Sequence, residues 1–269
     1  MSNEAHVALT DVVKIFSLGN AGAGASVQAL GPLELALKKG EFFSVIGPSG
    51  CGKSTLLEII AGLSGATSGE VLFDGMRLNA GVPPNVGVVF QEDASFPWLT
   101  VRNNIAFGLK RRGMPAAEIK TRVDKALELV GLKDFSSAYP SQLSGGMRQR
   151  VCIARTIVLE PELILLDEPF GALDQQTRLL MSDEILRIWR ETGTTIFLIT
   201  HSLDEATLLS DRIGVMSARP GRFLEIIETG WPRERDSRIV SQERFGVINA
   251  HLWELLRAES LKAVQPAEA

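Results

Sequence analysis

A glycine-rich stretch, Gly47-Pro48-Ser49-Gly50-Cys51-Gly52-Lys53-Ser54, stands between an apolar run and an apolar helical pattern. Its spacing, G-x-x-x-x-G-K-[S/T], is typical of a phosphate-binding loop. Glycines let backbone N–H groups turn toward phosphate oxygens, and the helix that follows adds its N-terminal dipole. Lys53 supplies positive charge, and the Ser54 hydroxyl, which Thr55 follows, suits Mg²⁺. We therefore expect a nucleotide with Mg²⁺ to bind here.

A second chemical feature is an apolar segment that ends in two acids. Leu163–Leu166 are four consecutive apolar residues, the pattern of a parallel strand that is covered on both faces. Asp167 and Glu168 follow at the carboxyl end, where ligands bind in such sheets. We expect Asp167 to hold Mg²⁺ and Glu168 to orient and polarise a water molecule. The alternative is a pair of solvated strand-end acids, which the presence of the phosphate loop makes much less favoured.

Another possible anion site is Ser144-Gly145-Gly146, which precedes a helical pattern. Ser144 is typical of an N-cap, and the two glycines leave backbone N–H groups open at a helix start. Taken alone, the same residues are also explained by a simple turn that leads into a helix.

Together these motifs resemble the ATP-binding subunits of ABC transporters, over roughly residues 7–228. The resemblance rests on order and spacing. It includes the Walker A loop at 47–54, the Q-loop residue Gln91, the signature Leu143–Met147, the Walker B acids Asp167 and Glu168, the D-loop at 171–174, and the switch histidine His201.

The resemblance implies that two subunits stack head-to-tail with ATP between them. Ser144, Gly145 and Gly146 would then contact the γ-phosphate held by the partner's Walker A loop. Gln91 would contact Mg²⁺ and the attacking water, and His201 would stabilise transition-state charge. The resemblance also assigns Asp174 of the D-loop and Phe16, as the aromatic ring stacked on adenine, to the nucleotide site. Core packing is the alternative for Phe16.

The fold class that follows is α/β: a P-loop ABC cassette with a mixed core sheet, an antiparallel β subdomain at the N-terminus and an inserted α-helical subdomain. We expect the cassette at 7–230, the insertion at about 92–159 and a helical extension at 231–269. Within the insertion, Met147, Val151, Ala154 and Val158 fall on one helical face. In the extension, an amphipathic helix is expected around Val240–Arg257.

Composition excludes several classes of protein. Lys plus Arg (28) nearly balance Asp plus Glu (32), so we expect no general nucleic-acid binding. No apolar run approaches the roughly 18 to 20 residues of a membrane helix, and the N-terminus has no signal-peptide pattern. Cys51 and Cys152 are expected as free thiols in the cytosol, and Cys51 should expose the phosphate loop to thiol reagents.

Three further segments resemble the nitrate/sulfonate/taurine importer subfamily: Phe96–Thr100, Met147–Arg150 and Ser217–Arg222. This resemblance implies an ATPase that energises import at the cytoplasmic face of the inner membrane. Its partners would be integral-membrane permeases, a second ATPase subunit, most simply an identical one, and indirectly an extracytoplasmic substrate-binding protein. The alternatives are an exporter's ATPase, a soluble ABC ATPase or, least well supported, a P-loop kinase. Residues 92–104 would receive a cytoplasmic helix of the permease.

Overall fold

The computed structural model describes residues 5–17, 26–78, 81–83, 85–90, 94–171 and 173–264. The chain divides into two units. Unit 1 comprises Met1–Pro84 and Thr195–Ala269, and unit 2 comprises Asn85–Thr194.

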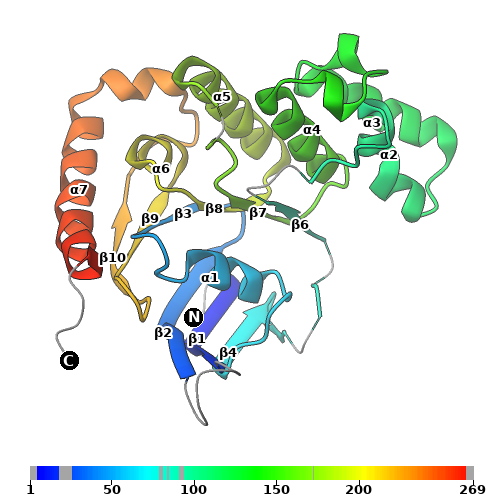
Figure 1. Cartoon of the computed structure of the whole chain (residues 1–269). Coiled ribbons are helices and arrows are strands. Elements are labelled where there is room, and N and C mark those ends of the chain that lie inside the picture. The colour runs from blue at the N-terminus through cyan, green and yellow to red at the C-terminus, as the bar shows by residue number, and fades with distance from the viewer. Residues whose placement is uncertain are drawn as a thin grey trace. The chain divides into compact units, whose positions relative to one another are not determined.

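Unit 1 contains an antiparallel sheet with the strand order β2-β1-β4-β5 (Figure 1). Its long strands have the alternating pattern of a sheet with one buried face: Leu33, Leu35 and Leu37 are buried, and the residues between them are exposed. The predicted antiparallel pair near the N-terminus is thereby confirmed. The strands are β1 (Ala5–Ser17), β2 (Ser26–Lys38), β4 (Ser68–Phe73) and the short β5 (Met76–Arg77), which the sequence did not suggest.

The second sheet of unit 1 is mixed, with its strands in the order β10-β9-β3-β8. β3 pairs parallel with β8 and β9, whereas β10 pairs antiparallel with β9. Figure 1 shows α1 on one face of this sheet and α6 on the other, which explains why every residue of β3 is apolar or small and buried. The bounds are β3 (Phe42–Ile46), α1 (Lys53–Ile60), β8 (Thr195–Ile199), α6 (Leu203–Leu209), β9 (Arg212–Met216) and β10 (Phe223–Glu228).

The C-terminal helix α7 (Glu243–Val264) packs against α6 and β9. It begins three residues after the predicted start at Val240 and continues past Arg257. The start differs because Asp236 caps a separate 3-10 turn, η3 (Ser237–Ser241), and Gln242 then adopts an extended conformation that interrupts the helix.

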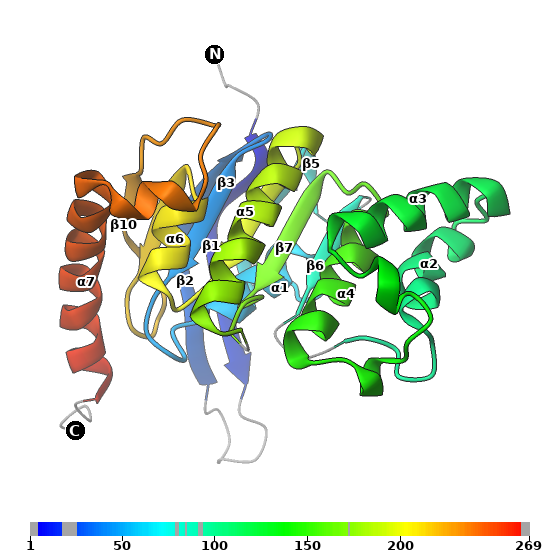
Figure 2. The same ribbon diagram turned by 90° about the horizontal axis from the view of Figure 1, so that it is seen from above.

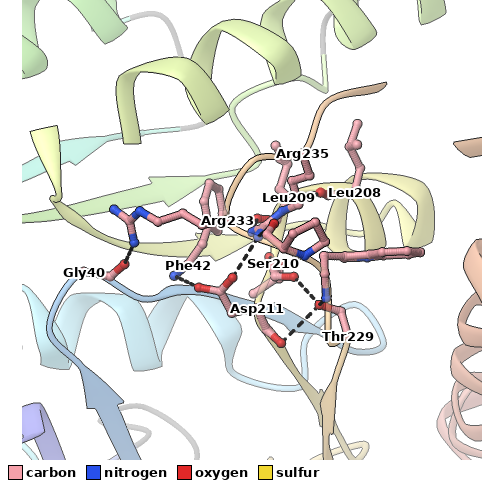
Figure 3. A network of polar contacts seen from close by, with 12 residues as sticks. Gly40, Phe42, Leu208, Leu209, Ser210, Asp211, Thr229, Arg233 and Arg235 are labelled. Atoms are coloured by element: carbon pink, nitrogen blue, oxygen red, sulfur yellow. Dashed lines mark hydrogen bonds and ion pairs between the residues drawn. The ribbon is translucent and has the colours of Figure 1, made fainter. Parts of the chain in front are cut away.

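Arg235 joins this C-terminal segment to α6, as Figure 3 shows. Its guanidinium is fully buried and donates to Asp211 Oδ1 at 2.8 Å and to the backbone oxygens of Leu208 and Leu209 at the end of α6. The second carboxylate oxygen of Asp211 accepts from the backbone N–H of Phe42 at 3.0 Å. One buried cation therefore closes the C-terminus of α6 and ties it, through Asp211, to the start of β3.

Unit 2 has a helical core (Figure 2). Val151 and Ala154 are fully buried among residues of α2 and α3, Val158 is also buried, and Met147 packs against them, which confirms the predicted apolar face. A parallel strand pair, β6 with β7, completes the unit together with α5. The bounds are α2 (Val101–Arg111), α3 (Ala116–Leu129), α4 (Gly145–Ile157), α5 (Gln175–Thr192), β6 (Val86–Val89), β7 (Leu163–Asp167), and the turns η1 (Lys133–Phe135) and η2 (Pro140–Gln142).

We predict that Arg235→Ala lowers the free energy of unfolding by about 3 kcal/mol, because it leaves Asp211 and two helix-end carbonyls without their buried cation. Urea unfolding would measure the loss. The control is Arg238→Ala, since Arg238 also pairs with an aspartate but lies in solvent and should cost less than about 1 kcal/mol. Equal losses in the two variants would contradict the structural role of Arg235.

Candidate nucleotide site

The phosphate loop lies in unit 1 between β3 and α1. Gly50 and Gly52 have φ angles of 74° and 104°, which residues other than glycine rarely adopt. At Gly52, which caps α1, a Cβ atom would lie 2.5 Å from Leu30 Cδ2, so no larger residue fits. The backbone is thus held in the turned conformation that a phosphate cradle needs.

Lys53 is folded over this loop. Its side chain is only 8% exposed, and Nζ donates to the backbone oxygens of Gly47 at 2.8 Å and Pro48 at 3.0 Å. Ser49 and Ser54 are exposed, and Thr55 is half-buried. A buried ammonium whose oxygen partners are two backbone carbonyls is well suited to exchange them for phosphate oxygens.

Cys51 corrects one expectation. The thiol is buried, with 1% of the residue exposed, and Sγ lies 3.9 Å from Lys53 Nζ. Desolvation by this burial raises the pKa of the Cys51 thiol, because it disfavours the thiolate. From its sequence position we expect Cys51 to expose the loop to thiol reagents. This expectation is wrong, because the buried thiol is shielded from them.

Phe16 lies on β1 opposite Val27 and is 40% exposed, with Lys14 Nζ 5.0 Å from its ring centroid. The ring is thus a surface feature, which argues against the alternative of core packing. Its role as the adenine-stacking residue remains a prediction.

His201 is exposed and follows β8 at the start of α6. The turn around it is held by side chains: Thr200 Oγ1 accepts from the Ser202 N–H at 3.0 Å and donates to the buried Glu205 carboxylate. Ser202 Oγ caps α6 by accepting from the Glu205 N–H. His201 is therefore presented to solvent from a rigid backbone.

In unit 2, Asp167 ends β7 and Glu168 follows it. Glu168 has a φ of 46°, an unusual left-handed conformation for a residue with a side chain, and its backbone oxygen accepts from the Gly171 N–H at 3.2 Å. Strained backbone of this kind is common at functional sites. The arrangement agrees with a specialised role for Glu168, and its part in catalysis stays a prediction.

The signature residues also lie in unit 2, at the start of α4. Ser144 caps the helix and its hydroxyl accepts from the Met147 N–H at 3.3 Å. The amides of Gly145 and Gly146 belong to the first turn, where helix geometry provides no acceptor. A Cβ on Gly146 would lie 2.7 Å from Leu173 Cδ2, so the signature packs closely against the D-loop of its own unit.

Asp174 caps α5: its carboxylate accepts from the backbone N–H groups of Gln176 and Thr177 and from the Thr177 hydroxyl at 2.6 Å. These bonds, that of the hydroxyl foremost, lower the pKa of Asp174. The structure thus gives Asp174 a capping role, and its part in nucleotide binding stays a prediction. Gln91 and the D-loop residue Ala172 lie outside the described residues.

One contact at the phosphate loop was missed from the sequence. The guanidinium of Arg219, in the turn between β9 and β10, donates to the backbone oxygen of Gly50 through Nε at 3.2 Å and Nη2 at 3.0 Å. From the sequence, Ser217–Arg222 indicates only a resemblance to a subfamily. Two arginines and a glycine in one turn after a buried strand were the available signal for a phosphate-loop contact.

The sequence of this chain matches a known protein family. The ABC transporter family matches residues 30–171, which include the phosphate loop, the signature and the Walker B acids. This chain belongs to the ABC transporter family. It is an ATP-binding cassette, with the P-loop α/β fold that the sequence predicted. Within the described residues, none of its helices has the length and apolarity needed to cross a bilayer.

Relatives and solved structures agree with this assignment. The chain is 51% identical to a taurine import ATP-binding protein of Roseobacter denitrificans, over 74% of each chain. It is 45% identical to an aliphatic sulfonates import ATP-binding protein of Bacillus cereus, over 83% of this chain and 88% of the relative. A dimeric ATP-binding cassette in a post-hydrolysis state with ADP and Pi superposes with a TM-score of 0.74 at 32% identity, covering 82% of this cassette and 98% of that one.

We predict that maleimide labels Cys51 in the folded Cys152→Ser variant roughly tenfold more slowly, or slower still, than in the same variant unfolded in urea, because the thiol reacts only after local opening. Since burial raises the pKa of Cys51, less thiolate forms at neutral pH, and the labelling rate should keep rising at pH values above those for an exposed cysteine. Mass spectrometry measures the rate. Rapid labelling of the folded protein at pH 7 would contradict the burial.

Proposed function

We propose that this cassette is the ATP-hydrolysing subunit of an importer for small sulfonates or related anions, and that it works as a pair of identical subunits. The observation that carries the proposal is that the chain holds two different helix starts whose glycine-rich backbone suits an anion, the Walker A loop in unit 1 and the signature in unit 2. Its relatives named as taurine and aliphatic sulfonate import proteins support the solute class.

In this proposal, residues 47–55 bind the phosphates of ATP. The glycine-rich backbone directs its N–H groups at the phosphate oxygens, and Lys53 exchanges the carbonyls of Gly47 and Pro48 for the β- and γ-phosphates. Phe16, exposed on β1, stacks on adenine.

Mg²⁺ fits the donors that the proposal assigns to it. Ser54 and Asp167 offer hydroxyl and carboxylate oxygens, which are the hard ligands that Mg²⁺ prefers, and Gln91 adds an amide oxygen. When bound, the ion neutralises charge on the β- and γ-phosphate oxygens. Ser54 lies on the first turn of α1 and Asp167 at the carboxyl end of β7, so each is carried by a regular element that limits its movement.

Hydrolysis is assigned to Glu168 and His201. Glu168 orients and polarises the attacking water by accepting its hydrogen bond, and it takes up the water's proton as the oxygen bonds to the γ-phosphorus and ADP leaves. His201 donates to the γ-phosphate oxygens, where negative charge develops in the transition state. The backbone of both residues is constrained, which favours preorganisation. Glu168 has a left-handed φ, and His201 lies between Thr200 and Ser202, which are joined by a hydrogen bond.

The signature completes the site from the partner subunit. The open amides of Gly145 and Gly146 and the Ser144 hydroxyl take up the γ-phosphate of the ATP bound by the other subunit's Walker A loop. ATP binding then closes the dimer, and loss of the γ-phosphate releases it. Asp174, as part of the D-loop, supports the same interface.

The proposed docking site for the permease is an aromatic patch in unit 2, defined by Phe96, Pro97, Trp98 and Phe107. Trp98 is 71% exposed, and Phe96 packs between it and Phe107. The loop is fixed because the buried Asn104 side chain bonds to the backbone N–H and oxygen of Phe96 and to two further carbonyls. A rigid, exposed aromatic patch is typical of a protein interface.

The remaining assignments follow from the importer role. The cassette acts at the cytoplasmic face of the inner membrane, with an extracytoplasmic substrate-binding protein as an indirect partner and no part in nucleic-acid binding. We assign the cassette to residues 7–230, with the helical insertion at 92–159, and the extension to 231–269.

We predict that Glu168→Gln traps a stable dimer with ATP and Mg²⁺, because the variant keeps the phosphate contacts but does not activate water. Size-exclusion chromatography with light scattering would measure the mass, and turnover should fall by about a hundredfold or more. The control is Glu191→Gln, an exposed carboxylate on α5 that should leave both quantities unchanged.

A Glu168→Gln protein that binds ATP but stays a monomer would argue against the paired site. A protein with Glu168 intact and with Ser144 and Gly145 substituted provides a second test. Full turnover by this protein as a monomer would also argue against the paired site.

We predict that Trp98→Ala weakens permease association by roughly thirtyfold, the effect of removing an aromatic residue from the centre of an interface, and leaves nucleotide affinity unchanged. Co-purification of the tagged cassette with its membrane partner, quantified by mass spectrometry, would measure this. Trp253→Ala is the control, since Trp253 is also exposed (60%) but lies on α7 in unit 1. Undiminished co-purification of Trp98→Ala would exclude this patch as the docking site.

A further inference from the structure

The turn between β9 and β10 touches the phosphate loop, and no role has been given to this contact. We propose that Arg219, in this turn, is a positioning residue that holds the phosphate loop in its nucleotide-binding conformation. The inference rests on the proposed function, because it takes residues 47–55 as the phosphate site.

The contact is specific to one carbonyl. Arg219 Nε and Nη2 lie 3.2 Å and 3.0 Å from the backbone oxygen of Gly50, so two donors of one guanidinium converge on a single acceptor. The Arg219 side chain is the group that a Cβ on Gly50 would meet first, at 3.4 Å. Charge-assisted hydrogen bonds of this kind are stronger than neutral ones.

This carbonyl matters because of how a phosphate loop works. N–H groups that converge on an anion require peptide planes whose oxygens face the other way. Those outward oxygens need partners, or the planes can rotate and turn an oxygen toward the phosphate. Lys53 bonds to the oxygens of Gly47 and Pro48 only until phosphate oxygens replace them, whereas Arg219 bonds to the oxygen of Gly50 from outside the loop and can keep this contact when nucleotide binds.

The turn that carries Arg219 is itself rigid. Ser217 Oγ accepts from the Arg222 N–H and donates to carbonyls within the turn. Gly221 exchanges backbone hydrogen bonds at 2.9 Å with β2, donating to Ala29 and accepting from Gly31. A Cβ at Gly221 would lie 2.1 Å from the Cys51 oxygen, so the turn and the loop are in direct backbone contact.

The same turn is supported from the C-terminal helix. The buried carboxylate of Glu259 on α7 accepts from the Ala218 N–H, one residue before Arg219, at 2.8 Å. The backbone on both sides of Arg219 is thus anchored, and its exposed side chain extends from this fixed turn to the oxygen of Gly50. Its positive charge also lies beside the loop that receives the phosphates, which adds a favourable long-range interaction.

The test uses the full-length chain and titrates Mg-ADP by isothermal calorimetry. Arg219→Ala should raise the dissociation constant by about tenfold, the effect of losing a hydrogen bond to a charged group. Arg219→Lys should recover part of the affinity, because it restores the charge without the paired donors. In ATPase assays KM for ATP should rise with the same ranking, whereas kcat at saturating ATP stays within about twofold, since Glu168 and His201 are untouched.

The matched control is Arg233→Ala. Arg233 also donates to one backbone oxygen in unit 1, that of Gly40 at 3.1 Å, which precedes β3 and lies at the opposite end of that strand from the phosphate loop (Figure 3). It should leave the ADP affinity unchanged. An unchanged affinity in Arg219→Ala, or an equal loss in Arg233→Ala, overturns the inference.

Lys53→Ala separates this inference from the proposed function. If Lys53→Ala abolishes ADP binding while Arg219→Ala has no effect, only the role of Arg219 is lost. If Lys53→Ala binds ADP normally, residues 47–55 are not the phosphate site and the proposed function fails.

Discussion

The site depends on one constraint, which is that peptide N–H groups must face an anion while their carbonyls find partners elsewhere. At the phosphate loop this requires glycines at Gly50 and Gly52, whose left-handed φ angles turn the backbone. It also requires partners for the carbonyls: Lys53 bonds to those of Gly47 and Pro48, and Arg219 bonds to that of Gly50. The loop, the first turn of α1 and the β9–β10 turn are therefore joined by these hydrogen bonds into one structural unit.

The same constraint distinguishes the start of α4 from the start of α5 in unit 2. Asp174 places a carboxylate on α5 and uses two backbone N–H groups, so its own negative charge occupies the position that an anion would take. Ser144 is neutral and takes only the Met147 N–H, which leaves the glycine amides of α4 available. Among these two helix starts, α4 is the one that suits a phosphate.

Local patterns predicted much of this cassette. The loop spacing, the apolar strand before Asp167 and the cap formed by Ser144 act through neighbours in sequence, so the sequence could reveal them. The sequence could not reveal what depends on distant segments. The backbone of Cys51 lies against Gly221, which is far along the chain, and the start of α7 is set by a separate turn that Asp236 caps. The Arg219 contact joins residues 169 positions apart.

The C-terminal segment supports two candidate functional regions of unit 1, the turn that carries His201 and the phosphate loop. Through Arg235 and Asp211 it closes the far end of α6, whose first turn follows His201. Through Glu259 it holds Ala218, next to the arginine that contacts the phosphate loop. Burying a charged group costs free energy unless the group is paired. The buried Arg235 and Glu259 therefore have a structural role in these two contacts. The extension after β10 is better understood as the support that keeps the histidine and the phosphate loop on one rigid frame.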